Sequence, residues 1–80
     1  MNYDKKLNTK KFTVEISTIE QYGYFEHDVY GDELGGGLWF ENNELVDFDG
    51  CMALPLEVAD AIIEMKCKVD KDIFCQLASR

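Results

Sequence analysis

The chain has 80 residues, of which 46% are hydrophobic, and its 16 Asp and Glu against 8 Lys and Arg give a formal net charge of −8. This length allows one small domain, and the apolar content is too high for a disordered acidic tail. The 54 residues from Phe12 to Met65 hold 13 carboxylates and no Lys or Arg. Direct binding of nucleic acid or of an anionic membrane through this segment is therefore excluded, because nothing in it neutralises phosphate.

Two strands are predicted in the first part of the chain. Residues 1–11 are polar and Lys-rich, and we expect them to be a flexible lead-in. Apolar and polar residues alternate from 12 to 19, which is the period of a half-buried strand. Residues 22–30 are rich in aromatic residues and predict a second strand.

A glycine-rich segment and a hairpin come next. Three consecutive glycines lie within residues 31–37, and their conformational entropy predicts a flexible connection rather than a regular element. Asn42-Asn43 lies between two apolar runs and is typical of a two-residue hairpin turn, because Asn tolerates a positive φ. Asp49-Gly50 predicts the turn that ends this hairpin.

The last third of the chain is predicted to be helical. Pro55 favours a helix start, because its fixed φ suits the first turn. The apolar face of this helix has helical spacing and comprises Val58, Ala59, Ile62, Ile63 and Met65. Asp70 is a candidate cap for a second, short helix, whose inward residues are expected to be Ile73, Phe74, Leu77 and Ala78. The prediction is one α+β domain over residues 12–80, an antiparallel sheet of about four strands packed against one or two C-terminal helices.

Catalysis has little support in this sequence. The single histidine, His27, lies mid-strand among apolar neighbours, which favours a partly buried structural role over a catalytic base. Cys51, Cys67 and Cys75 are odd in number and fit no zinc spacing, so we expect reduced thiols that act as small buried apolar side chains. Cys67, between two lysines, is the best candidate for a reactive thiol. We expect no enzymatic activity, no cofactor and no metal site.

The carboxylates have a placement that local stability does not favour. Glu41 and Glu44 are expected to face each other across the hairpin turn, and like charges in that arrangement destabilise a sheet. Asp47 and Asp49 share one face of their predicted strand, and their spacing is similar to that of successive phosphates on one nucleic-acid strand. Glu26 and Asp28 form a second pair of this kind.

A further stripe of acids is predicted on the helix, where Glu57, Asp60 and Glu64 have helical spacing. An acidic surface that only keeps the protein soluble is the alternative interpretation. Solubility is served by interspersed charges of both signs, whereas all basic residues here lie outside 12–65. We therefore favour a surface that binds a basic, nucleic-acid-binding groove on another protein.

The candidate partner-binding residues are one aromatic residue and the acids of the predicted strands and turns. They are Tyr24, Glu26, Asp28, Asp32, Glu33, Glu41, Glu44, Asp47 and Asp49. Tyr30 is a second candidate for an exposed aromatic anchor. Trp39 is expected in the core.

Three segments carry a resemblance to known proteins: Gly-Gly-Leu-Trp-Phe-Glu at 36–41, Leu-Val-Asp-Phe-Asp-Gly at 45–50, and Leu-Pro-Leu-Glu-Val-Ala at 54–59. Together they resemble small acidic proteins encoded by phages and prophages, among which anti-CRISPR and anti-restriction inhibitors that mimic DNA are well represented. The resemblance covers roughly residues 11–66. It implies a protein that binds a host nuclease or surveillance complex and blocks its nucleic-acid site.

The resulting hypothesis is a non-enzymatic, anti-CRISPR-like phage inhibitor that acts in the cytoplasm of a bacterial host. Its expected partner is a basic nucleic-acid-binding protein or CRISPR effector complex, with no direct contact to nucleic acid or membrane. The alternatives are a dimeric adaptor or assembly module, for which a homodimer would supplement a small core, and a small regulator that binds one basic protein.

Overall fold

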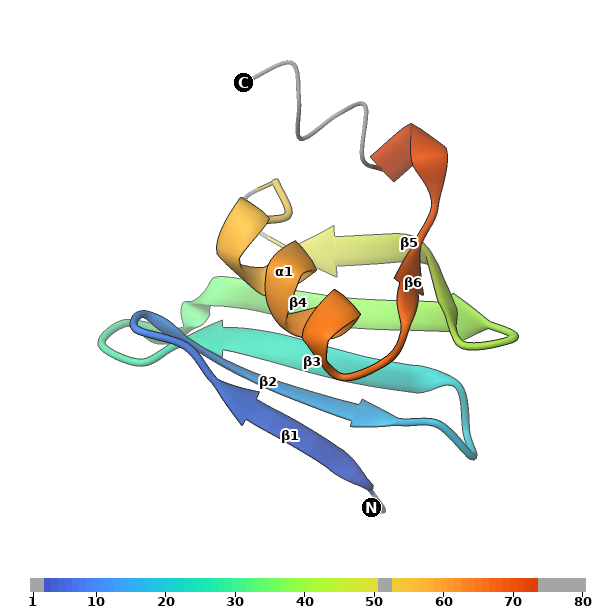
Figure 1. The fold of residues 1–80 in the computed structure, drawn as a ribbon. Helices are drawn as coiled ribbons and strands as arrows, with labels where there is room; N and C mark the ends of the chain where they lie inside the picture. Colours follow the sequence, from blue (N-terminus) through green and yellow to red (C-terminus); the bar gives the residue numbers. More distant parts are fainter. Residues whose placement is uncertain (1–2, 51–52, 74–80) are drawn as a thin grey trace.

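The computed structural model describes residues 3–50 and 53–73 and consists of one curled sheet with a helix across one face (Figure 1). The elements are β1 (Lys5–Asn8), β2 (Phe12–Ser17), β3 (Tyr22–His27), β4 (Gly31–Glu41), β5 (Glu44–Gly50), α1 (Leu56–Glu64) and β6 (Lys68–Val69). The strand order in the sheet follows the chain, β1-β2-β3-β4-β5-β6. The first five strands are antiparallel neighbours, and β6 pairs with β5 in parallel. The sheet has the shape of half a barrel.

The α+β expectation holds broadly, but the predicted sheet was wrong in two respects. It has six strands rather than about four, and it is mixed rather than wholly antiparallel. The short β6 follows α1 and runs beside β5 because the chain returns across the sheet face after the helix (Figure 1). A connection of this kind places a strand parallel to its neighbour.

One face of the sheet packs against α1 and forms the core. Alternation along the strands turns Val14, Phe25 and Leu38 toward the helix, and their side chains are fully buried. Val58 and Ile62 of α1 meet them from the other side. The helix face predicted from the sequence is confirmed at Val58, Ala59, Ile62 and Met65. Ile63 was wrongly included, since it is 43% exposed, and Ala61 takes its place among the buried residues.

The expected lead-in contributes the first strand of the sheet. Residues 5–8 form β1, and Leu7 packs against the core. Lys5 lies on the same face of the sheet, and its ammonium donates to the carbonyl of Met65 at the end of α1. The last turn of α1 has no basic residue of its own, so Lys5 supplies the positive charge that a helix C-terminus favours. The Lys-rich composition of this segment therefore gave no sign that it forms a strand, or that its Lys5 contacts the end of α1.

The glycines at 35–37 do not form a flexible connection, as predicted, but lie inside β4. A Cβ atom on Gly35 would lie 2.3 Å from the carbonyl oxygen of Phe25, and one on Gly36 would lie 1.7 Å from that of Asp49. Only glycine permits this approach of three strands. The conformational entropy of glycine favours a loop, but the close packing of these strands requires glycine and depends on residues far away in the sequence.

Turns and helix ends follow the sequence in part. The predicted turn at Asp49-Gly50 was wrong, because both residues lie in β5 and pair with β4. Asn42 and Asn43 have φ of 52° and 63°, which confirms the two-residue turn. Pro55 is the residue that precedes α1, so the helix begins one position after it. The backbone N–H of Asp72 donates to the Asp70 carboxylate at 2.8 Å, at the start of a helical turn over residues 71–73. Ile73 is buried as expected, whereas Phe74, Leu77 and Ala78 lie outside the described residues.

Candidate functional site

The face of the sheet that α1 does not cover carries most of the predicted site residues. Alternation that buries Phe25 and Leu38 turns their neighbours outward. The strand register then forms two rows across β2 to β5. The first row is Glu15, Tyr24, Gly37 and Asp49, and the second is Tyr22, Trp39 and Asp47, with Ser17 buried at its β2 end. We call this surface the helix-free face.

Four acids gather on the β4–β5 part of this face, and we call Glu41, Glu44, Asp47 and Asp49 the β4–β5 acidic patch. Glu41 and Glu44 are directly opposite each other in the register, as predicted. Asp47 and Asp49 point to the same side of β5, opposite Trp39 and Gly37. A bulge between Trp39 and Phe40 adjusts the register so that the acids on both sides of it stay on the helix-free face.

The other predicted acids form a separate group around the β3–β4 connection: Glu26, Asp28, Asp32 and Glu33. The side chain of Glu26 shares a hydrogen bond with Asp32, and this bond, together with partial burial, raises the pKa of Glu26. The prediction that Glu26 and Asp28 share a strand face was wrong, because β3 ends at His27. Asp28 instead lies in the turn and accepts a hydrogen bond of 2.8 Å from the Thr13 hydroxyl.

Aromatic side chains lie between these two acidic groups. The ring of Tyr3 contacts those of Tyr22 and Tyr24 edge to face, with centroid distances of 5.6 and 5.2 Å. The benzo ring of Trp39 lies over Gly37, within 3.0–3.5 Å of the position that a Cβ atom there would take. We call Tyr3, Tyr22, Tyr24 and Trp39 the aromatic platform. Trp39 is 46% exposed, so its predicted core position was wrong.

The tyrosines of the platform are held by carboxylates as well as by ring contacts. The hydroxyl of Tyr24 donates to the Glu15 carboxylate across the β2–β3 pair, and this bond raises the pKa of Tyr24 above its usual range. Burial and the charge of Glu20 raise the pKa of Tyr22. Both phenols therefore stay protonated at neutral pH. Tyr3 was missed because it lies in the segment expected to be flexible, where only its aromatic character marked it.

The fold mixes charges more than the linear sequence predicts. Lys6 pairs with Glu15 at one edge of the sheet, and Lys68 pairs with Glu44 at the other. Basic residues from both ends of the chain thus return beside two of the central acids. Asp47 and Asp49 have no such partner in the register of the described strands. The register therefore places a basic residue beside an acid at each sheet edge, whereas Asp47 and Asp49 lie opposite Trp39 and Gly37.

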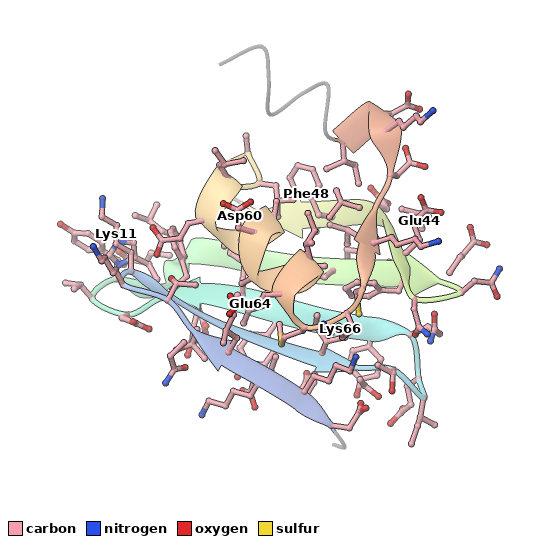
Figure 2. The ribbon with its side chains drawn as sticks, viewed as in Figure 1. Lys11, Glu44, Phe48, Asp60, Glu64 and Lys66 are labelled. Atoms are coloured by element: carbon pink, nitrogen blue, oxygen red, sulfur yellow. The ribbon has the colours of Figure 1, made fainter. Side chains whose placement is uncertain are left out.

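The opposite side of the molecule carries the helical acids (Figure 2). Asp60 and Glu64 are exposed on α1. Lys11, which contacts the third helical acid, lies at the end of the sheet opposite to Glu44 (Figure 2). Glu57 differs from these two acids, because its carboxylate accepts a 3.0 Å hydrogen bond from the backbone N–H of Lys11. Hydrogen bonds from Thr9 and Lys11 lower its pKa. The predicted helical stripe therefore consists of one structural acid and two exposed acids.

His27 has the structural role that the sequence favoured. Its Nδ1 accepts hydrogen bonds from the backbone N–H groups of Val29 at 3.0 Å and Tyr30 at 3.4 Å. Its ring packs against those of Phe12 and Tyr30, with centroid distances of 5.1 and 4.9 Å. Nδ1 is thus an acceptor engaged in closing the β3–β4 turn. Tyr30 itself is 56% exposed in this turn, away from the aromatic platform.

Cys67 is buried, with 3% of its surface exposed, and burial raises the pKa of its thiol. It acts as a small core side chain, and its candidacy as a reactive thiol was wrong. Cys51 and Cys75 lie outside the described residues.

Within residues 3–50 and 53–73, no group of three or more His, Cys, Asp and Glu side chains is arranged to hold a metal ion. Over the same ranges no helix is long and apolar enough to cross a membrane.

Comparisons of the chain with protein-family models, with curated proteins and with solved structures find no match.

Proposed function

We propose that the protein is a non-enzymatic inhibitor of the anti-CRISPR type, encoded by a phage, that binds a basic nucleic-acid-binding protein in the cytoplasm of its bacterial host. Its binding surface is the β4–β5 acidic patch with the adjoining aromatic platform. The observation that supports this most is the cross-strand pair Glu41 and Glu44, beside Asp47 and Asp49 on the same face.

Like charges directly opposite each other destabilise a sheet by about 0.2–1 kcal/mol relative to a neutral pair. A Lys in place of either Glu41 or Glu44 would turn this term into a stabilising one. The β4–β5 part of the helix-free face instead has carboxylates at each of its four polar positions, and in the register of the described strands its basic neighbour is Lys68 of β6, opposite Glu44. A surface needed only for solubility gains nothing from that uniformity. A surface that binds a basic groove gains from a single sign of charge, because that charge attracts the basic partner and repels nucleic acid.

Inhibition by such a surface is competitive occlusion. Asp47 and Asp49 stand two residues apart on one strand face, roughly 6.6–7 Å along the strand. The spacing of these two carboxylates is similar to that of successive phosphates, so lysines and arginines of a phosphate-binding groove can bind them. The exposed Trp39 beside them offers apolar area for a hot spot. No bond is made or broken, so the protein needs no cofactor.

Affinity capture from a bacterial lysate tests this function. The wild-type protein is expected to retain nucleic-acid-binding proteins at low salt and to release them at high salt or on addition of duplex DNA. Charge reversal at Glu41, Glu44, Asp47 and Asp49 to Lys is expected to abolish capture. A matched pair controls for net charge: reversal of Asp47 and Asp49 alone and reversal of Asp60 and Glu64 on α1 each change two acids to Lys, and only the first is expected to weaken capture. Recovery of the protein alone would contradict the proposal and favour an assembly module formed by copies of this chain.

A further inference from the structure

Trp39 has a position that packing within the fold does not require. Its benzo ring lies over Gly37, where a side chain of any other residue would displace it. The register places Tyr24 on one side of Gly37 and Asp49 on the other. Although it lies on the sheet surface among other aromatic residues, nearly half of Trp39 remains exposed, at 46%. The result is a flat aromatic surface with a carboxylate beside it.

The charges around Trp39 select the kind of group that can cover it. Asp47 is opposite Trp39 in the register and Asp49 is opposite Gly37, so both carboxylates border the indole ring. A nucleotide that stacked its base on the ring would bring its phosphate close to these acids, and the repulsion between like charges opposes that binding. A second copy of the chain would bring another net charge of −8. A cationic side chain of a partner protein is the complementary occupant.

An arginine fits this arrangement better than a lysine. Its guanidinium is planar and weakly hydrated, so it stacks on an aromatic face while its N–H groups donate to carboxylates in the same plane. The ammonium of lysine is a strongly hydrated point charge without a flat face. Trp39 supplies the face, and Asp47 and Asp49 supply acceptors at its border. Oδ1 of Asp47 already accepts a 2.9 Å hydrogen bond from the Phe48 N–H, so its Oδ2 and the carboxylate of Asp49 are the acceptors for a partner. Tyr22 and Tyr24, protonated at neutral pH, extend the surface without adding charge.

We propose that the Trp39 surface seats the guanidinium of an arginine from the partner protein, with Asp47 and Asp49 as its hydrogen-bond acceptors. This rests on the proposed function, of which it names the recognition mode. It makes the interaction selective for arginine-rich basic proteins over lysine-rich ones of equal charge.

Titration with octa-arginine and octa-lysine at low salt tests the inference. Trp39 is the single tryptophan of the chain, so its fluorescence reports on this surface alone. Octa-arginine is expected to bind about two- to five-fold more tightly than octa-lysine and to produce the larger change in Trp39 emission. In Trp39→Leu, calorimetry is expected to show equal affinity for both peptides. Tyr30→Leu removes an exposed aromatic residue outside the platform and should keep the preference.

The outcomes separate this inference from the proposed function. Equal binding of both peptides to the wild type, with equal changes in emission, would overturn the arginine seat and leave an acidic binding surface. An arginine preference that persists in Trp39→Leu would show that arginine binds elsewhere on the protein and would also overturn the inference. Binding of neither peptide would contradict both proposals. The wild-type fluorescence titration decides between these outcomes even if Trp39→Leu does not fold.

Discussion

The replacement of Gly36 by Ala tests the packing that builds the helix-free face. Gly36 has no positive φ, so alanine suits its backbone conformation. In an ordinary strand this change stabilises a protein by about 0.5–1 kcal/mol, because glycine loses more entropy on folding. Here the new Cβ would lie 1.7 Å from the carbonyl oxygen of Asp49 and 2.8 Å from the Cα of Gly50. Both contacts are to backbone, so β4 and β5 must move apart.

The expected effect is large for a domain of this size. Overpacking in a close-packed site costs about 1–3 kcal/mol where side chains can shift, and backbone on both strands yields less readily. The total free energy of unfolding is roughly 4–12 kcal/mol for 80 residues. We expect Gly36→Ala to lose about 3 kcal/mol in urea unfolding monitored by far-UV circular dichroism.

Gly37→Ala is the matched control for this variant. Its Cβ would meet only the ring of Trp39, with the nearest atom at 3.0 Å, and that exposed side chain can move. We expect a change in free energy of unfolding below about 1 kcal/mol together with a shift in Trp39 emission. A Gly36→Ala protein as stable as Gly37→Ala or the wild type would refute the close approach of β4 and β5.

Three further predictions concern titration and burial. Because Asp32 and partial burial raise the pKa of Glu26, the folded protein binds that proton more tightly than the unfolded chain, and stability is lost as pH rises through the folded pKa. Glu26→Gln should therefore raise the free energy of unfolding in urea at pH 7 by about 0.2–1 kcal/mol, but not at pH 3. Hydrogen bonds from the hydroxyl and backbone N–H of Thr18 lower the pKa of Asp4, so their stabilisation is present above the unfolded pKa and is lost as pH falls through the folded one. Asp4→Asn should lower Tm at pH 7, and this loss should shrink as pH falls; a loss of equal size at neutral and at acid pH would contradict this. The Cys67 thiol is buried and has a raised pKa, so it should react with a thiol reagent only after the protein unfolds. The labelling rate is measured in a variant in which Cys51 and Cys75 are replaced by Ser. Rapid labelling of the folded protein would show that the thiol is accessible and would contradict this prediction.

The parts of the fold that depend on neighbouring residues could be predicted from the sequence. The Asn42-Asn43 turn requires a positive φ that Asn tolerates, and its two strands follow from local alternation. The same turn places Glu41 opposite Glu44, so this part of the candidate site was also predictable. The start of α1 after Pro55 is a similar local feature.

The parts that depend on distant contacts could not be predicted. Gly35 and Gly36 are strand residues because β3 and β5 approach them, and their own composition favours a loop. β1 is a strand because it pairs with β2, and the hydrogen bond from its Lys5 to the end of α1, 60 residues away, is a contact that a Lys-rich composition does not indicate. Trp39 is exposed because the helix covers the other face of the sheet, which alternation alone does not decide.

The central claim is that the helix-free face, and not acidity in general, binds a basic partner. The most direct measurement is the salt dependence of affinity for the captured partner with two variants of equal net charge, Asp47→Asn with Asp49→Asn and Asp60→Asn with Glu64→Gln. We predict that the first variant binds more weakly and loses up to about two units of slope in log affinity against log salt, whereas the second keeps the wild-type slope. Equal loss in both variants would show that net charge alone drives binding and would contradict the account.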